Sequence, residues 1–312
     1  MRYVPTFSVL GLALAAVMFV APGAGGLGPP AEARQAAAGG QAGGGGPRGP
    51  GGPRGPQRPR TRKVVLAWAD TRNGIAQHDS TSHALAVIER LGYESGAYDT
   101  YIRTDSNIAA MDPKRTTGEP ASGGPNLRMA DAIFFLGHRD VPVDDQQKAD
   151  ILQFVREGKG FVAAHTALTA WDTWPEFGEL LGGRYDGHPW NTATAPIVNE
   201  GTDFPATRHF PPAFTFTDEF YQPKLFSRAN ARVLLRVDAT KMPANADVHV
   251  QNGDMPIVWA KTYGKGRVFY SSLGHDAGTW DDRDVGQMYL EALKWALGLT
   301  EGDATPRPMP AR

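Results

Sequence analysis

Short apolar runs alternate with amphipathic segments from residue 63 onward. "KVVLAWA" (63–69) is an apolar run rich in β-branched residues, and "STSHALAVIERLG" (80–92) repeats apolar residues at helical spacing. Ser80 or Thr81 is placed to cap the second segment, and Gly92 is placed to end it. The pattern therefore predicts a β-strand followed by an α-helix.

Two further apolar runs flank a second amphipathic segment. "ADAIFFLG" (130–137) and "FVAAH" (161–165) have strand length, and "VDDQQKADILQFVREGKG" (143–160) lies between them, with Asp144 and Asp145 at its start and Gly158 near its end. Parallel neighbouring strands need crossover connections. The alternation therefore predicts an α/β domain, a three-layer sandwich with a mostly parallel sheet between helices.

The last third of the domain adds more strands and a closing helix. "ARVLLRVD" (231–238) and "MPIVWAKTYGKGRVFYSSLG" (255–274) are strand-like, and "VGQMYLEALKWALG" (285–298) is helical in period. The glycines of "YGKGR" (263–267) indicate a hairpin turn. We therefore expect an antiparallel edge on the sheet.

The first 60 residues have a different character. Arg2 precedes an apolar run at 7–21, and Ala31-Glu32-Ala33 is a small-x-small cleavage site, so we predict a signal peptide over 1–33 and a periplasmic or secreted protein. A membrane anchor is the alternative, but the run is shorter than the ~20 residues that span a bilayer. Residues 34–60 are mostly Gly, Pro, Ala and Arg, which predicts a disordered linker. The domain then covers 61–300, and 301–312 is a flexible tail.

The net charge and the absence of cysteine exclude some classes of function. Six of the 32 Lys and Arg residues and one of the 33 Asp and Glu residues precede residue 61, so the remaining chain has a net charge of −6. This balance argues against a nucleic-acid partner. The chain has no cysteine, which excludes disulfides and a cysteine nucleophile. After removal of the signal peptide we expect no stable membrane insertion.

Histidines follow the predicted strands at one end of the sheet, where ligands bind in open parallel sheets. They are His78, His138, His165 and His275, and His188 can fold back over the same edge. Neutral imidazoles bind divalent metals such as zinc, and nearby carboxylates (Asp79, Asp186, Asp276) can ligate or orient them. We predict metal ligands at His78, His165, His188 and His275. The alternative for each is a histidine that hydrogen-bonds the backbone of a polar loop.

Several other residues are candidates for chemistry or binding. His165 stands at a strand-to-helix turn where hydrolases carry Ser or Cys, and it can act as a general base or a metal ligand. Trp171 and Trp174 offer faces for a sugar ring or pack in the core. Of the adjacent Asp218 and Glu219, at most one side chain reaches the site. A serine hydrolase would use Ser271 or Ser272.

Five motifs occur in the order and spacing of the ThuA-like (trehalose-utilisation) family. They are "HDS" (78–80), "FVAAHTA" (161–167), "GGRYDGHP" (182–189), "TDEFY" (217–221) and "PIVWAKTYGKGRVFYSSLGHD" (256–276). The chain resembles this family from about residue 63 to residue 299. The resemblance implies a flavodoxin-like, class I glutamine amidotransferase-like fold in which His165 replaces the amidotransferase cysteine, so amidotransferase activity is not expected. It also implies a role in the breakdown of disaccharides or keto-sugars. Gln77 departs from the residue that the family usually has there.

Together these features predict an exported carbohydrate-active protein. As a mechanism we expect a divalent metal to polarise a sugar carbonyl or hydroxyl, in a hydrolase, lyase or isomerase reaction. The predicted catalytic residues are His165, Asp186 and Glu219, and the predicted substrate contacts are Trp171, Trp174 and Tyr221. The alternative is a non-catalytic carbohydrate-binding or partner-docking module on the same fold.

Overall fold

The computed structural model describes residues 62–115, 117–121, 124–250 and 252–310. The predicted signal peptide (1–33) and linker (34–60) lie outside these residues. Among the helices of the described residues, none combines the length and the apolar character needed to cross a membrane.

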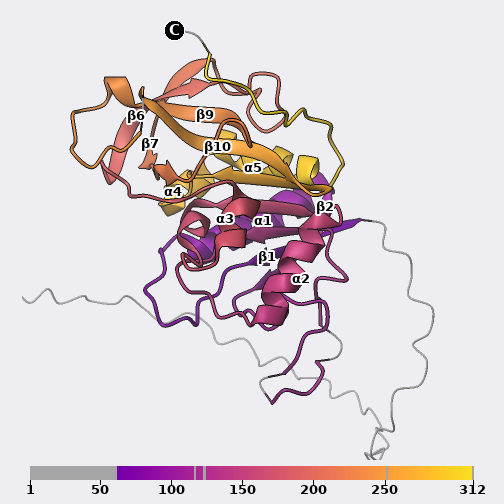
Figure 1. Cartoon of the computed structure of the whole chain (residues 1–312). Coiled ribbons are helices and arrows are strands. Elements are labelled where there is room, and N and C mark those ends of the chain that lie inside the picture. The colour runs from indigo at the N-terminus through magenta and orange to yellow at the C-terminus, as the bar shows by residue number, and fades with distance from the viewer. Residues whose placement is uncertain (1–61, 116, 122–123, 251, 311–312) are drawn as a thin grey trace, which may run out of the picture. The chain divides into compact units, whose positions relative to one another are not determined.

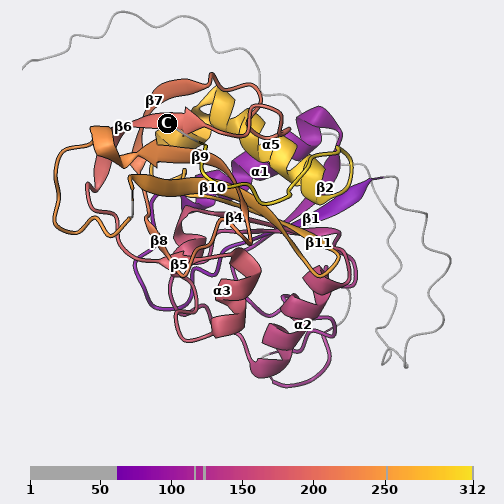
Figure 2. The ribbon, with the colours of Figure 1, turned by 45° about the horizontal axis from the view of Figure 1, so that its top comes forward.

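One large mixed sheet forms the middle layer (Figures 1 and 2). Its strands, in spatial order, are β2 (Tyr98–Arg103), β1 (Lys63–Trp68), β3 (Ala132–Phe135), β4 (Gly160–Ala164), β11 (Gly266–Ser271), β10 (Asp254–Tyr263), β9 (Arg232–Asp238), β6 (Thr192–Asn199) and β7 (Ala213–Glu219). Pairing is parallel from β2 to β11 and antiparallel from β11 to β7. The α/β fold with an antiparallel edge is thus confirmed, with four strands beyond β11.

Helices cover both faces of the sheet. Helices α1 (Thr81–Ser95), α4 (Ala277–Asp281) and α5 (Arg283–Ala296) contact one another on one face, and α2 (Asp145–Arg156) and α3 (Pro175–Leu181) contact each other on the other. Alternate residues of β1 enter different cores: Val65 packs with α1 and α5, whereas Leu66 packs with α2 and α3. Because the central strands are buried on both faces, their sequences are continuous apolar runs.

The strand ends determine where the site lies. Trp68 at the end of β1 pairs with Phe135 at the end of β3, and Ala164 at the end of β4 pairs with Ser271 at the end of β11. Because these strands are parallel, their following loops meet at one edge of the sheet. A separate two-stranded sheet, β5 (Arg184–Tyr185) with β8 (Pro223–Lys224), connects the segment after α3 to the segment after β7.

The ends of two helices differ in how well the sequence predicts them. Asp144 accepts a hydrogen bond from the Gln147 amide, and the Gln147 side chain accepts one from the Asp144 amide, so α2 starts with a capping box as Asp144 suggests. Helix α1, in contrast, runs past Gly92 and ends at Gly96, whose φ is 68°. Gly92 is required for packing instead, since a Cβ there would lie 2.4 Å from the Tyr98 ring.

The predicted flexible tail is bound to the domain over its first residues. The carbonyl of Gly302 accepts a hydrogen bond from Trp295 Nε1 at 3.0 Å, and the carbonyl of Asp303 accepts one from the buried Arg232 guanidinium. Arg307 forms ion pairs with Asp203 and Asp303 at 3.1 Å. Residues 302–307 therefore belong to the folded domain.

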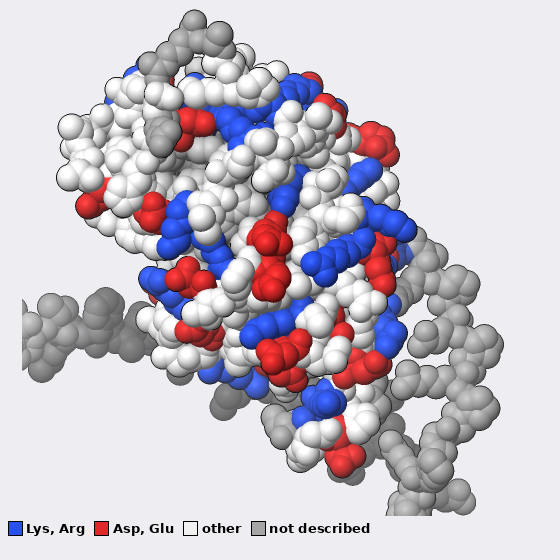
Figure 3. All heavy atoms as spheres, viewed as in Figure 1, with Lys and Arg blue, Asp and Glu red and all other residues white. Residues whose placement is uncertain are grey.

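Charges of both signs are mixed on the surface shown in Figure 3. Among the described residues on that face, Lys and Arg side chains alternate with Asp and Glu and form no continuous basic patch. This face therefore lacks the concentrated positive charge that binding to a phosphate backbone needs.

Candidate metal centre

His165 occupies a strained turn at the end of β4. Its φ is 40°, in the left-handed region that non-glycine residues rarely adopt, and a short 3₁₀ helix (His165–Thr169) starts there. The side chain is fully buried. Its carbonyl oxygen accepts a hydrogen bond from the Tyr270 hydroxyl at 3.1 Å, which holds the turn in place. The tight turn thus points the His165 imidazole into the interior at the edge of the sheet.

Two neighbours fix the orientation of that imidazole. His165 Nδ1 lies 2.7 Å from the carbonyl oxygen of Ser272, so Nδ1 carries the proton and donates it. The ring also stacks on Tyr221, with centroids 4.3 Å apart. The lone pair of the neutral ring is therefore on Nε2, as in many metal-binding histidines whose other nitrogen donates to a carbonyl.

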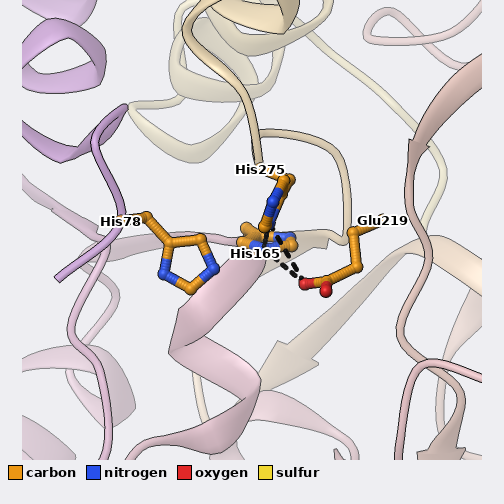
Figure 4. Close-up of side chains that lie close together, drawn as sticks. All are labelled: His78, His165, Glu219 and His275. Atoms are coloured by element: carbon orange, nitrogen blue, oxygen red, sulfur yellow. Dashed lines mark hydrogen bonds and ion pairs between the residues drawn. The ribbon is translucent and has the colours of Figure 1, made fainter. Parts of the chain in front are cut away.

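Glu219 and His275 meet the free nitrogen of His165 (Figure 4). His165 Nε2 lies 3.4 Å from Glu219 Oε2 and 3.4 Å from His275 Nδ1, and His275 Nδ1 lies 3.2 Å from Glu219 Oε2. His78 completes the group, because one ligand atom from each of the four residues lies within 4.8 Å of the others. We call these four residues the His–Glu cluster.

The buried Asp218 holds two members of the cluster in position. Its Oδ1 accepts hydrogen bonds from the amides of Glu219 at 2.8 Å and His275 at 3.2 Å. Its Oδ2 accepts from the Gly274 amide at 2.8 Å and the Thr279 hydroxyl at 3.2 Å. Asp218 thereby ties the end of β7 to the loop after β11. As expected for adjacent strand residues, only one of the two carboxylates, that of Glu219, faces the cluster.

A second set of contacts joins the loop of His78 to that of His275. The Ser80 hydroxyl donates to the Gly274 carbonyl at 3.0 Å rather than capping α1, and Trp280 Nε1 donates to the same oxygen at 3.0 Å. Gly274 has a φ of 134°, and a Cβ there would lie 2.8 Å from the Trp280 ring. Only glycine fits this position, directly before His275.

The protonation states suit metal binding. Burial, with the adjacent charges of His165 and His275, lowers the pKa of His78 to about 4, so His78 is neutral at pH 7. Burial acts to raise the pKa of Glu219, but the interactions of its carboxylate with the imidazoles of His165, His188 and His275 outweigh it and lower this pKa to about 2. A neutral imidazole and an ionised carboxylate are the forms that coordinate a metal.

The spacing of the cluster also matches a divalent metal. Zn²⁺ with ligand bonds of about 2.0–2.1 Å in tetrahedral geometry separates neighbouring ligand atoms by about 3.3 Å. The three distances among His165, Glu219 and His275 are 3.2–3.4 Å. His275 has a further carboxylate near its other nitrogen, with Nε2 3.8 Å from Asp276 Oδ1. The residues present therefore fit such an ion.

The comparisons with known proteins agree with this fold. The model of the family described as "ThuA: Trehalose utilisation" matches residues 64–296. The chain belongs to the ThuA family. Among solved structures, a ThuA-like protein from Bacteroides uniformis is 21% identical with a TM-score of 0.61, and the match covers 78% of this chain and 95% of that one. One from Parabacteroides merdae is 16% identical with a TM-score of 0.58, covering 80% and 93%. No curated protein matches this ThuA-family chain in sequence.

The predicted ligand His188 lies beside the cluster rather than in it. Its Nε2 is 3.6 Å from Glu219 Oε1, and its Nδ1 contacts the Tyr185 hydroxyl. Glu219, predicted as a catalytic residue, is the fourth member of the cluster, where the sequence predicts His188. Asp186, two residues before His188, pairs with His249 at 2.9 Å.

The two tryptophans predicted to bind sugar are part of the core of this ThuA-family domain. Trp171 and Trp174 are 5% and 7% exposed. Trp171 stacks on Phe135 with centroids 5.0 Å apart, and Trp174 stacks on Phe177 at 5.6 Å. Their faces are covered by packing, so they provide no platform for a sugar ring. Tyr221 is likewise buried, with one face against His165.

The serine-hydrolase alternative does not match the geometry. Ser271 and Ser272 are fully buried at the end of β11. Ser271 Oγ accepts from the Leu273 amide at 3.2 Å, and Ser272 Oγ accepts from the Tyr221 amide at 2.9 Å. His165 approaches the carbonyl of Ser272 rather than its hydroxyl. The two serine hydroxyls therefore hold the backbone around the site in place by accepting hydrogen bonds from its amides.

Sequence reasoning missed the roles of three residues. Asp218 positions cluster members, Tyr185 contacts His188, and His249 pairs with Asp186. Tyr185 stands inside the "GGRYDGHP" motif and Asp218 inside "TDEFY", so the motifs contained the signal. His249 follows no strand, and no pattern in the sequence singles it out.

Proposed function

We propose that this ThuA-family protein is a metal-dependent enzyme that acts on a disaccharide or a keto-sugar. The observation that carries the proposal is the set of three distances, 3.2–3.4 Å, among His165 Nε2, His275 Nδ1 and Glu219 Oε2. The family description, trehalose utilisation, supports a carbohydrate as the substrate.

In this proposal His78, His165, Glu219 and His275 hold a divalent ion such as zinc. When bound, the ion supplies Lewis acidity to a sugar carbonyl or hydroxyl. His188 is the group we assign to proton movement, because its Nε2 lies 3.6 Å from Glu219 Oε1 and its ring is partly exposed. Asp186, which pairs with His249 at 2.9 Å, accepts hydrogen bonds from the sugar.

The test starts with the metal content of the purified protein after reconstitution with Zn²⁺. We expect about one ion per chain in the wild type and a loss of that ion in His165→Ala, His275→Ala and Glu219→Gln. His83→Ala is the matched control, since His83 is a partly exposed histidine on α1 whose Nε2 pairs with Asp281 at 2.8 Å. A wild-type protein that binds no metal after reconstitution would refute the proposal.

Measurements of turnover distinguish an enzyme from a binding module. Disaccharides and their keto forms should be converted by the metal-loaded wild type, and conversion should disappear together with the metal in the three variants. A binding module would instead retain its affinity for sugar in those variants and convert nothing.

Export is a further part of the proposal. The apolar run at 7–21 and the site at 31–33 support cleavage and release into the periplasm or medium. Cell fractionation with sequencing of the mature N-terminus tests it, and an intact Met1 on protein in the cytoplasm would contradict it.

A further inference from the structure

Strand β2 (Tyr98–Arg103) is an open edge of the large sheet (Figures 1 and 2). Among the described strands it pairs with β1 alone, so one side of its backbone has no neighbouring strand. Such an edge presents unpaired amides and carbonyls that can add a further strand. Exposed apolar side chains favour that addition, and β2 has two, since Tyr101 and Ile102 are each 41% exposed.

The hydrogen bonds to β1 determine which residues of β2 face the open edge. The Ala69 amide, directly after β1, donates to the Arg103 carbonyl at 3.1 Å, so Arg103 turns its backbone polar groups toward β1. Because the direction of these groups alternates along a strand, those of Thr100 and Ile102 point to the open edge. Thr100 and Ile102 are therefore the residues that can hydrogen-bond to an added strand.

The side chains of β2 lie on two faces of the sheet. The buried Tyr98 donates a hydrogen bond to the Ile88 carbonyl of α1 at 2.9 Å, so the even-numbered residues of β2 lie on the face of α1. Asp99, Tyr101 and Arg103 lie on the other face. We call these three residues the β2 row. Its end charges are accessible, because the side chains of Asp99 and Arg103 are 58% and 34% exposed.

The β2 row is complementary to itself in the antiparallel direction. When two copies of β2 pair about a two-fold axis at Tyr101, Asp99 lies opposite Arg103 of the second copy, and Tyr101 lies opposite its own equivalent. Thr100 and Ile102 then exchange backbone hydrogen bonds across the axis. The β2 row falls at the non-hydrogen-bonded positions, where opposed side chains are closest. Opposite charges and aromatic pairs at such positions stabilise a sheet.

The end charges of the β2 row also have partners within the chain. Asp99 lies 3.5 Å from Arg62, and Arg103 lies 2.8 Å from Asp105. Pairing of two copies would therefore place each of these charges between two charges of opposite sign. A network of this kind contributes more than an isolated exposed ion pair.

The opposite edge of the sheet lacks this complementarity. Strand β7 contains the carboxylates of Asp218 and Glu219 and no Lys or Arg. Two copies of β7 paired antiparallel would have no cation within the strand to place against either carboxylate. Both carboxylates also belong to the surroundings of the candidate metal centre. The edge at β2 is therefore the one that fits a second copy of this chain.

We propose that this protein forms a two-fold symmetric dimer in which the β2 strands of two copies pair antiparallel about Tyr101 and join the two sheets into one. Such an interface uses the same surface on both copies, so the assembly closes at two. The dimer is independent of the proposed function, because no residue of β2 is a member of the His–Glu cluster.

A disulfide across the two-fold axis tests the pairing directly. The chain has no cysteine, so Tyr101→Cys introduces a single thiol. Opposed residues at a non-hydrogen-bonded position have Cα atoms about 4.5 Å apart, a separation that a disulfide can bridge. With diamide as the oxidant, the full-length variant should become a covalent dimer on non-reducing gels. Leu225→Cys is the matched control, because Leu225 is 84% exposed and lies outside β2, and it should remain unlinked.

Charge reversal tests the register by sedimentation equilibrium of the full chain. Asp99→Arg and Arg103→Asp should each weaken the dimer about tenfold or more, since each variant places like charges opposite each other twice. The double variant restores opposite charges and should recover the wild-type dissociation constant to within about threefold. Leu225→Lys should leave the dimer unchanged. Urea unfolding of each variant separates loss of the dimer from loss of the fold.

Three results would overturn the proposal. The first is a wild-type chain that remains monomeric up to about 100 µM. The second is a dimer that resists both charge reversals while Tyr101→Cys stays unlinked, which would place the interface on another surface. The third is a folded double variant that fails to recover the dimer. Metal content should equal that of the wild type in every β2 variant, so absence of metal in an intact dimer would refute the proposed function alone.

Discussion

At the scale of single residues, the conformation of His165 carries an energetic cost. Its φ of 40° disfavours any residue with a Cβ, by about 1–2 kcal/mol relative to glycine. We expect His165→Gly to be more stable than His165→Ala by about 1 kcal/mol in urea unfolding, although both variants lose the metal ligand. If His165→Ala were equally stable or more stable, packing of the extra methyl group would outweigh backbone strain at this turn.

Three of the four cluster members could be predicted from the sequence, and the fourth could not. His78, His165 and His275 each follow a parallel strand, so the topology rule alone brings them to one sheet edge, and the structure gathers them there. The choice between His188 and Glu219 as the fourth member depends on hydrogen bonds that Asp218 accepts from the amides of Gly274 and His275, which lie 56 and 57 residues away in the sequence. No local pattern encodes contacts of that range.

At the scale of elements, two helical glycines are expected to respond in opposite ways to alanine. In α1 a Cβ on Gly92 would lie 2.4 Å from the buried Tyr98 ring, so Gly92→Ala should destabilise the domain by about 1–3 kcal/mol. In α5 the nearest atom to a Cβ on Gly286 is Leu91 Cδ2 at 4.0 Å, so Gly286→Ala should stabilise it by up to about 1 kcal/mol. Urea unfolding of both variants tests the pair, and a stabilising Gly92→Ala would show that the Tyr98 ring can move.

Gly92 also shows why element ends are harder to predict than element types. A glycine near the end of an amphipathic run is a common stop signal, but here helix α1 continues because the strand β2 residue Tyr98 packs against Gly92. Strand β2 itself was not predicted, since only Tyr98 of its six residues is fully buried and an exposed edge strand lacks an apolar run. The buried strands β1, β3 and β4, by contrast, lie within one or two residues of their predicted bounds.

At the scale of the whole domain, the end of the chain closes the structure over the buried Arg232. The guanidinium, 1% exposed, contacts the Asp303 carbonyl and Asp203, and its Nε has no hydrogen-bond partner among the described residues. A chain that ends at Thr300 loses the Asp303 contact and the Trp295–Gly302 hydrogen bond. We expect this truncation to destabilise the domain by about 2–3 kcal/mol, because hydrogen bonds to a buried charged group are among the strongest.

A chain that ends at Arg307 is the matched control, since it retains Gly302, Asp303 and the ion pairs of Arg307. Its unfolding midpoint in urea should equal that of the full chain. Metal content should stay unchanged in both truncated proteins, because the contacts of Arg232 do not include the cluster at the carboxyl ends of β4 and β11. Equal stability of the two truncated chains would mean that Asp203 alone satisfies the guanidinium, and that residues 301–307 cover the domain without stabilising it.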